Sequence, residues 1–465
     1  MKKRFYALCT VCLVICGILS SCNEGPYRIQ DGVIVFPEPS RAPGQTDMLS
    51  FAASPLDTVR VGFIGLGMRG PSAVYRFSYI DGARVAALCD LEPDRVDSSC
   101  RILSERGLPP ASRYSGEDGW KRLCESDDID LVYICTDWQS HVDIAVYAME
   151  HGKHVAVEVP AATSVADCWR LVDTSERTRR HCMMLENCVY DFFELTTLNM
   201  AQQGLFGEIL HAEGSYIHNL SEYWDDYYGN WRLDFNRSHR GDVYATHGLG
   251  PDCQLLGIHR GDRMDYLVAM DTKSVIGRSL AEERMGKDSF ANGDQTTTVI
   301  RTVNEKTILL QHNVYTPRPY DRMYQVVGTK GYAEKYPYPG YSFEPDQIED
   351  SIRSYDDLSS HSFVPDDVRD ALMEKYRHPI VKEIEEKAKK VGGHGGMDFI
   401  MDYRLVYCLR NGLPLDQDVY DAAEWSCIGE LTSASIENGS KPVRVPDFTR
   451  GAWDKLDGLH FALVK

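Results

Sequence analysis

A glycine-rich turn near the start of the folded chain sets the narrowest limit on its architecture. The β-branched, apolar run 59–64 leads directly into the hexapeptide GLGMRG at 65–70, and a helical pattern follows. Gly65 permits the tight turn, Gly67 lets the backbone approach a phosphate group, and Gly70 allows close helix packing. The unpaired N–H groups at the start of such a helix attract an anion. Strand, turn and helix in this order predict a dinucleotide-binding unit.

The residue that follows the next strand narrows the choice of dinucleotide. The apolar run 84–89 ends in Asp90, twenty residues after Gly70. A carboxylate at this position accepts hydrogen bonds from a ribose 2′-hydroxyl and repels a 2′-phosphate. We therefore expect NAD rather than NADP, although the nearby Arg95 leaves the second dinucleotide open. The alternative is a glycine turn with an unrelated acidic residue and no nucleotide.

Strands and helices continue to alternate after this unit. Strands are expected at 131–135, 154–157 and 182–185, with helices at 141–151 and 164–177. This alternation predicts a doubly wound parallel sheet, whose ligands collect beyond the carboxyl ends of the strands. Polar loops lie at those ends at 137–141, 158–160 and 186–187, where we expect the nicotinamide half of the cofactor. For each loop, a helix cap or a satisfied polar turn is the alternative.

Beyond residue 187 the pattern changes to strands without regular helical crossovers. Segments rich in Thr, Val, Ile and Tyr occur at 209–218, 266–276, 296–302, 307–315 and 323–328. They predict a mostly antiparallel, open sheet in an α+β domain, and the glycine-rich stretch 394–398 opens a helix to Leu409. The sequence thus predicts a Rossmann domain at 58–186, of α/β class, followed by an α+β substrate domain at 187–465.

The amino terminus has the features of an export signal. Lys2, Lys3 and Arg4 precede an apolar run at 5–19 that is too short for a comfortable bilayer span. The run ends in Leu-Ser-Ser-Cys, which resembles the lipobox of bacterial lipoproteins and implies lipidation of Cys22. We expect a signal peptide at 1–21, a tether at 22–57, and an exported bacterial lipoprotein held at the membrane by its lipid. An ordinary signal peptide or a short anchor helix is the alternative.

Charge and cysteine content exclude some partners. Fifty basic and sixty-nine acidic residues give a net charge of −19, which repels nucleic acid. Four of the fourteen cysteines lie in the first 22 residues, and the other ten show neither CxxC pairs nor zinc-ligand spacing. We expect mostly free thiols, with room for one or two disulfides, and no metal site.

Five longer motifs follow one another in a specific order. They are GKHVAVEVPAA (152–162), MMLEN (183–187), THGLGP (246–251), PRPY (317–320) and HGGMDFIM (394–401). Together they resemble the Gfo/Idh/MocA oxidoreductase superfamily and, within it, glycoside hydrolase family 109, over about 58–446. The dehydrogenases of the superfamily carry Glu-Lys-Pro after this strand, and that lysine assists proton removal. Here Glu158-Val159-Pro160 matches the family 109 pattern, and Val159 can neither donate nor accept a proton.

The resemblance implies an NAD-dependent glycosidase that acts on a glycan or glycoconjugate, in the first place an α-N-acetylgalactosaminidase. In the family chemistry NAD⁺ takes hydride from C3 of the sugar, the C2 proton becomes acidic and is removed, and the aglycone leaves C1. Water then adds and the hydride returns. Asp225 and Asp226 are therefore not needed as a catalytic carboxylate pair. The alternatives are an NAD-dependent sugar dehydrogenase and a non-catalytic glycan-binding lipoprotein; a homo-oligomer stays open.

The resemblance also assigns site residues, motif by motif. Positions that match cofactor contacts, besides the glycines, are Met68, Arg69, Asp90, Trp138, Gln139, Ser140, His141, Glu158, Val159 and Asn187. Positions that match substrate contacts are Tyr216, Arg232, Tyr244, His247 and Tyr320. His247 is the best candidate for proton transfer, because imidazole changes charge near neutral pH. The alternative is a histidine bonded into loop backbone.

Three further features of the motifs leave questions open. Tyr190 is a second, weaker candidate for a proton relay, with simple packing as the alternative. The aromatic stretch 223–231 offers stacking faces for a sugar, of which we expect one or two to be used. Ala245 stands where the family usually has proline before Thr-His, which loosens the expected loop around His247.

Overall fold

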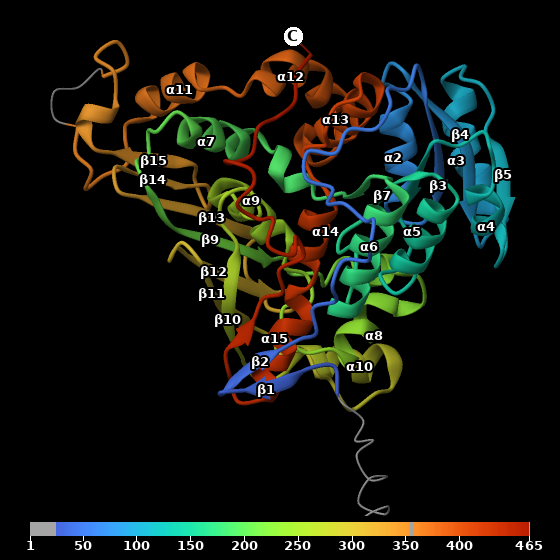
Figure 1. The fold of residues 1–465 in the computed structure, drawn as a ribbon, viewed down its shortest axis with the longest axis horizontal. Helices are drawn as coiled ribbons and strands as arrows, with labels where there is room; N and C mark the ends of the chain where they lie inside the picture. The colour runs from blue at the N-terminus through green and yellow to red at the C-terminus, as the bar shows by residue number, and fades with distance from the viewer. Residues whose placement is uncertain (1–24, 354–357, 465) are drawn as a thin grey trace, which may run out of the picture.

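Two β-sheets organise the molecule (Figure 1). The structure is a computed structural model and describes residues 25–353 and 358–464. The expected signal peptide and Cys22 lie outside the described residues. Within the described part, no helix combines the length and the apolar character needed to cross a membrane.

The first sheet has six parallel strands in the order β5-β4-β3-β6-β7-β8. Its strands are β3 (Val59–Ile64), β4 (Ala83–Asp90), β5 (Ser112–Ser115), β6 (Leu131–Ile134), β7 (His154–Val157) and β8 (Cys182–Met184). Its helices are α2 (Gly70–Phe77), α3 (Pro93–Glu105), α4 (Gly119–Cys124), α5 (His141–Glu150) and α6 (Val165–Thr178). All residues of β6 and β7 are buried, as expected where helices cover both faces. The predicted doubly wound sheet is confirmed.

The second sheet has ten strands in the order β1-β2-β16-β10-β11-β12-β9-β13-β14-β15. Its strands are β1 (Arg28–Gln30), β2 (Val33–Val35), β9 (Ile209–Ile217), β10 (Met264–Asp271), β11 (Thr296–Thr302), β12 (Thr307–Asn313), β13 (Asp321–Gly328), β14 (Gly331–Glu334), β15 (Gly340–Phe343) and β16 (Val443–Arg444). The pairs β12–β9 and β16–β2 are parallel and the other pairs are antiparallel. The predicted, mostly antiparallel sheet is confirmed.

Nine helices of the described chain accompany this sheet. They are α7 (Phe192–Gln202), α8 (Trp231–Ser238), α9 (Thr246–Leu256), α10 (Ile276–Met285), α11 (Asp366–Lys375), α12 (Pro379–Val391), α13 (Met397–Asn411), α14 (Val419–Ser426) and α15 (Ile428–Glu437). Helices α9 and α15 pack on the sheet, whereas α14 packs on α6 and β8 of the first domain. Near the top of Figure 1, α13 lies beside α2. The two domains are therefore joined along an extensive helical interface.

The expected strand 266–276 ends early. Strand β10 stops at Asp271, and α10 begins at Ile276. The side chain of Asp294 accepts hydrogen bonds from the N–H groups of Val275, Ile276 and Gly277, at 2.8, 2.9 and 3.1 Å. A carboxylate from a distant segment thus caps the helix start, which local sequence could not reveal.

The cysteines and strand β5 also refine the expectations. All ten cysteines of the described chain are free, and eight of them are buried, so no disulfide forms among them.

Strand β5 was not expected because its sequence, Ser-Arg-Tyr-Ser, is polar. It pairs with β4 at an edge of the sheet, where a polar strand can face water.

The segment expected to be a tether is packed where the structure describes it. Strands β1 and β2 form a hairpin, and β2 pairs with β16 at the edge of the large sheet. Ile34 and Phe36 are buried, with exposed fractions of 0 % and 4 %. The expectation of a free tether over 25–57 is therefore corrected. Its strands of three residues are too short to show a period in the sequence.

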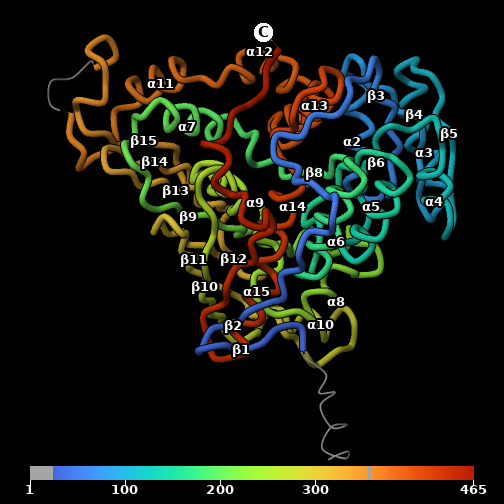
Figure 2. The backbone as a smooth tube through the Cα atoms, viewed as in Figure 1, coloured from blue at the N-terminus to red at the C-terminus, as the bar shows by residue number. Residues whose placement is uncertain are grey.

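The rest of this segment runs along both domains (Figure 2). The Arg41 guanidinium binds the buried carboxylate of Glu176 in α6 at 2.9 Å. The backbone N–H of Met48 donates to the Tyr420 hydroxyl of α14 at 3.0 Å. The segment therefore contacts both domains. It does so through individual hydrogen bonds and ion pairs rather than through a regular strand or helix.

The packed hairpin predicts a stability effect that a tether would not show. Phe36→Ala should lower the free energy of unfolding by about 3 kcal/mol, because it removes a buried aromatic ring. Ile29→Ala, in the same hairpin but with Ile29 49 % exposed, is the matched control and should stay within about 0.5 kcal/mol of the parent. Denaturant unfolding measures both. Equal effects of the two substitutions would contradict the packing.

Candidate functional site

A cleft of about 780 Å³ opens at the carboxyl ends of β3, β4 and β6. Its floor is the glycine-rich turn at 65–69, and Asp90 stands on one wall. The opposite wall comes from the second domain and includes Tyr227, Tyr228 and Trp231. The position agrees with the general rule for ligands of doubly wound sheets.

The glycine turn has the shape that a bound pyrophosphate requires. Gly65 has a φ of +90°, and a Cβ there would lie 2.6 Å from the carbonyl oxygen of Cys135. A Cβ at Gly70 would lie 2.1 Å from the carbonyl oxygen of Gly65. At Gly67 a Cβ would meet the end of the Arg95 side chain at 3.6 Å and no backbone atom within 4 Å, so only a flexible side chain lies against this glycine. Helix α2 starts at Gly70 without a side-chain cap from Arg69, which leaves its N–H groups for an anion.

Asp90 is held in place at the tip of β4. Its Oδ2 accepts the N–H of Leu66 at 2.6 Å, and its Oδ1 accepts the N–H of Glu92 at 3.0 Å. The Arg95 guanidinium lies 3.6 Å from Oδ1 and also over the ring of Tyr228, 5.0 Å from its centroid. Arg95 is thus engaged by a carboxylate and a ring, which fits a ribose 2′-hydroxyl at Asp90 better than a 2′-phosphate.

A charged network lies beside the turn. Arg69 extends Nε to 3.5 Å from Glu158 and Nη2 to 3.3 Å from Asp398. Asp398 also accepts from the Asn187 amide at 2.6 Å and lies 2.9 Å from Nδ1 of His394. Burial alone would raise the pKa of Asp398, but His394 and two guanidinium groups hold it well below its usual range. This network links Arg69, Glu158 and Asn187, which are distant in sequence.

A second, fully buried group joins α2 to α13. Arg76 donates from Nε to Asp402 at 2.6 Å and approaches Asp398 at 3.5 Å. The Tyr133 hydroxyl of β6 donates to Asp402 at 2.9 Å. Burial raises the pKa of Asp402 to about 6 although Arg76 opposes this shift. The helix that starts at the glycine turn is therefore tied to the second domain.

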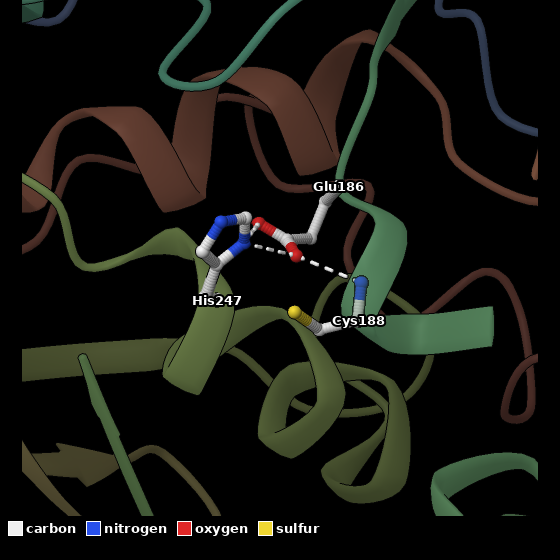
Figure 3. A group of neighbouring side chains, drawn as sticks. All are labelled: Glu186, Cys188 and His247. Carbon is white, nitrogen blue, oxygen red and sulfur yellow. Dashed lines mark hydrogen bonds and ion pairs between the residues drawn. The ribbon is translucent and has the colours of Figure 1, made fainter. Parts of the chain in front are cut away.

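His247, at the start of α9, pairs with Glu186, which follows β8 (Figure 3). Its Nδ1 lies 2.7 and 2.9 Å from the two carboxylate oxygens. Glu186 is fully buried and also accepts the N–H of Cys188 at 3.0 Å. Burial would raise the pKa of Glu186, but these partners lower it, so the group is an anion. Nδ1–H therefore donates to Glu186, and the second ring nitrogen, Nε2, has no hydrogen-bond partner among the described residues.

Aromatic rings and one arginine surround His247. The ring centroids of Tyr216 and Tyr244 lie 5.4 and 5.0 Å from that of the imidazole. The Arg232 guanidinium lies 4.4 Å from the Tyr244 centroid and 5.0 Å from that of Trp138. Arg232 is only 5 % exposed, and its Nε has no hydrogen-bond partner in the described structure. A buried donor without a partner next to aromatic faces suits a polyhydroxylated ligand.

His218 extends this wall toward the surface. Its Nδ1 lies 3.0 Å from the Tyr216 hydroxyl, and its ring meets Tyr223 and Tyr320 edge-on at 5.4 and 5.0 Å between centroids. Burial, helped by the charge of Arg232, lowers the pKa of His218 to about 4. The neutral ring can then accept a hydrogen bond from Tyr216. His218 was not among the expected residues, although strand alternation places it on the same face as Tyr216.

Two family models match this chain. One, described as the NAD-binding Rossmann fold of an oxidoreductase family, matches residues 59–186; the other, the C-terminal domain of glycosyl hydrolase 109, matches residues 190–455. Glycosyl hydrolase family 109 protein 1 of Bacteroides fragilis is 61 % identical over 451 residues, which are 96 % of this chain and 97 % of the relative. The protein of the same name from Bacteroides thetaiotaomicron is 62 % identical over 431 residues, 92 % of each chain.

The chain belongs to glycosyl hydrolase family 109. The resemblance seen in the sequence motifs is thereby confirmed, and with it an enzyme of a family of NAD-using glycosidases. Solved structures with the same fold include levoglucosan dehydrogenase in complex with NADH and levoglucosan, with a TM-score of 0.62 and 17 % identity over 84 % of this chain and 99 % of the other. Apo scyllo-inositol dehydrogenase from Lactobacillus casei has a TM-score of 0.59 and 14 % identity, with the same coverage.

The expected cofactor residues of this family 109 enzyme fall into three groups. Gly65, Gly67, Met68, Arg69, Asp90 and Ser140 line the cleft. Gly70, His141, Glu158, Val159 and Asn187 are buried or bonded around it: for example, the ring nitrogens of His141 lie 2.9 and 3.1 Å from the carbonyl oxygens of Pro160 and Thr136. Trp138 belongs to the aromatic wall, and the Gln139 side chain is exposed outside the cleft lining.

Tyr190 does not join the group around His247. It is fully buried, and its hydroxyl donates to Asp416 at 3.3 Å, a carboxylate that also binds Arg404 at 2.7 Å. Burial raises the pKa of Tyr190 well above its usual range, and the charge of Asp416 adds to this shift. The hydrogen bond to Asp416 directs the Tyr190 hydroxyl to Arg404 of α13 rather than to His247. The geometry favours the packing alternative.

Sequence reasoning missed two acidic residues of the site. Glu186 was expected only as part of a strand-end loop, and Asp398 only as part of a motif. Glu186 directly precedes Asn187, for which a cofactor contact was expected, whereas no neighbour of Asp398 in the sequence carried an expected role. Their partners lie 61 and 329 residues away in the chain, for His247 and Arg69 respectively, so no local signal identified the pairs.

Glu186→Gln should lower kcat by about 100-fold, because the imidazole loses the anion that orients it and stabilises its charged form. Glu424→Gln is the matched control: Glu424 is buried and binds Nδ1 of His259 at 2.8 Å, outside the cleft. Steady-state kinetics and NAD content should be measured for both variants. A normal kcat in Glu186→Gln, or an equal loss in the control, would contradict the assignment.

Proposed function

We propose that this family 109 enzyme is an NAD-dependent α-N-acetylgalactosaminidase that works by transient oxidation and elimination. The observation that carries the proposal is the His247–Glu186 pair, which supplies a proton acceptor within the aromatic wall. At the position where superfamily dehydrogenases carry their lysine, the chain has Val159, which is only 4 % exposed. Proton transfer is therefore assigned to α9 rather than to the loop after β7.

NAD is the cofactor that the cleft supports. Its pyrophosphate would be held by the N–H groups of the glycine turn and the start of α2, and its adenosine ribose by Asp90. Arg69, fixed by Glu158 and Asp398, stands between the turn and the loops expected at the nicotinamide. When bound, NAD supplies the reversible removal of hydride from C3 of the sugar.

The side chains of the second domain perform the remaining steps. Nε2 of His247 takes the proton from C2 of the oxidised sugar, and Glu186 stabilises the imidazolium that results. The imidazolium then protonates the aglycone oxygen as its bond to C1 breaks, whereas the proton of the C3 hydroxyl passes to water on oxidation and returns with the hydride. Arg232 donates hydrogen bonds to sugar oxygens from a position packed against Tyr244 and Trp138. Tyr216 stays protonated, because burial raises its pKa to about 12. Its one O–H is directed to His218, so its oxygen can accept a hydrogen bond from a sugar hydroxyl or an N-acetyl N–H.

The purified enzyme should release p-nitrophenol from p-nitrophenyl α-N-acetylgalactosaminide without net formation of NADH, because the two electrons return to the sugar in each turnover. NADH is followed by its fluorescence, since p-nitrophenol also absorbs near 340 nm. Stoichiometric NADH would instead identify a sugar dehydrogenase, and neither signal would identify a binding protein. A panel of α- and β-linked aryl glycosides tests the anomer and the N-acetyl group.

In deuterated water the released sugar should carry deuterium at C2. Unlabelled product over many turnovers would exclude elimination.

We further propose that the protein is exported and anchored through a lipid on Cys22. The support is the cationic start, the apolar run 5–19 and the Leu-Ser-Ser-Cys sequence, all of which precede the described chain. Cys22→Ser should release the protein from the membrane fraction on cell fractionation, whereas Ser21→Ala, which leaves a small residue beside the cysteine, should not. Equal membrane association of the two variants would contradict lipidation.

A further inference from the structure

One wall of the dinucleotide cleft is made by a segment of the second domain, residues 223–231. Trp224 anchors it, being 1 % exposed and stacked on Tyr315 at 6.1 Å between centroids and an angle of 12°. Tyr227 is 7 % exposed and accepts a 2.6 Å hydrogen bond from Arg232. The segment is thus fixed to the same arginine that stands in the aromatic wall around His247.

Tyr228 differs from its anchored neighbours. It is 64 % exposed, and it lines the cleft together with Arg95 of α3. The Arg95 guanidinium lies over its ring, 5.0 Å from the centroid. The two side chains belong to different domains, so their contact spans the cleft. The place of this contact is marked by Asp90, whose Oδ1 is 3.6 Å from Arg95.

We propose that Arg95 and Tyr228 form a clasp that retains the adenosine half of NAD in the cleft. Asp90 identifies this end of the cleft as the ribose end, and the ring and the guanidinium reach across it. The glycine turn, Asp90 and residues 226–228 line this part of the cleft, so the contact between Arg95 and Tyr228 would lie across the path of a departing adenosine. Neither residue is among the cofactor contacts that the family resemblance implied; Tyr228 belongs to the aromatic stretch that was expected to offer stacking faces to a sugar.

The clasp has a purpose in the proposed reaction, although it rests only on the part of that proposal that concerns NAD. A cofactor that is reduced and reoxidised in every turnover has to stay bound while the sugar is unsaturated. Loss of the reduced cofactor at that moment would leave a product that the enzyme could not complete. A cation–π contact at an exposed site is weak, so we expect it to slow release by a factor of about 2 to 5 rather than to determine affinity alone.

The test measures release of NADH from the whole enzyme. Purified protein is loaded with NADH and mixed with excess lactate dehydrogenase and pyruvate, which oxidise only NADH that has left the cleft; the fall in absorbance at 340 nm gives the release rate. Arg95→Ala and Tyr228→Ala should each release NADH about 2- to 5-fold faster than the parent. The double variant should be no faster than the faster single variant, because both remove one contact.

Two controls separate the clasp from general effects. Tyr228→Phe keeps the ring and should release NADH at the parental rate. Arg106→Ala removes a guanidinium that lies 3.4 Å over the ring of Tyr79, outside the cleft, and should also leave release unchanged. Parental release rates in Arg95→Ala and Tyr228→Ala would overturn the clasp and leave the proposed function intact. A parent that retains no NADH would overturn both proposals.

Discussion

The architecture of the cleft depends on a buried ion cluster between α2 and α13. Arg76 and Asp402 are both buried, and their 2.6 Å contact is completed by Tyr133 and Asp398. Removing Arg76 would leave Asp402 without its cationic partner in a low-dielectric interior, which costs several kcal/mol. Because α2 begins at the glycine turn, the cluster fixes the phosphate site of one domain against a helix of the other. The phosphate site therefore depends on the packing of the two domains against each other.

Asp398 of this cluster also holds polar side chains beside the cofactor cleft of a protein whose net charge is negative. Arg69 reaches toward the turn from a position between Glu158 and Asp398, and Asn187 also donates to Asp398. Asp398 thus places one cation and one amide near the expected nicotinamide loops without adding free negative charge there. The attraction for phosphate comes from backbone N–H groups and a helix start, which do not depend on the net charge of −19.

Features that depend on neighbouring residues could be predicted from the sequence, whereas contacts between separate segments could not. The glycine turn, Asp90 and the parallel strands were predictable because each depends on neighbours within one βαβ unit. The pairing of His247 with Glu186 and the capping of α10 by Asp294 join segments far apart in the chain, which no periodicity encodes. The segment 25–57 was misread for a related reason: its contacts, such as Arg41 with Glu176, come from single side chains on an irregular backbone.

The loop after β7 and the aromatic wall around His247 differ in the groups that they offer for proton transfer. A lysine at 159 would add a second cation beside Glu158, whose carboxylate already lies 3.5 Å from Nε of Arg69. With Val159 buried, that loop keeps only its cofactor-side contacts, and a base has to come from the sugar side. In the proposed reaction His247 meets this need, because its Nδ1 is bound to the buried anion Glu186 and its ring lies beside those of Tyr216 and Tyr244, which can stack on a pyranose. Cofactor binding and proton transfer are thus carried out by different groups of side chains in the proposed reaction. The cofactor can stay bound while protons move at His247, as a reaction with no net redox change requires.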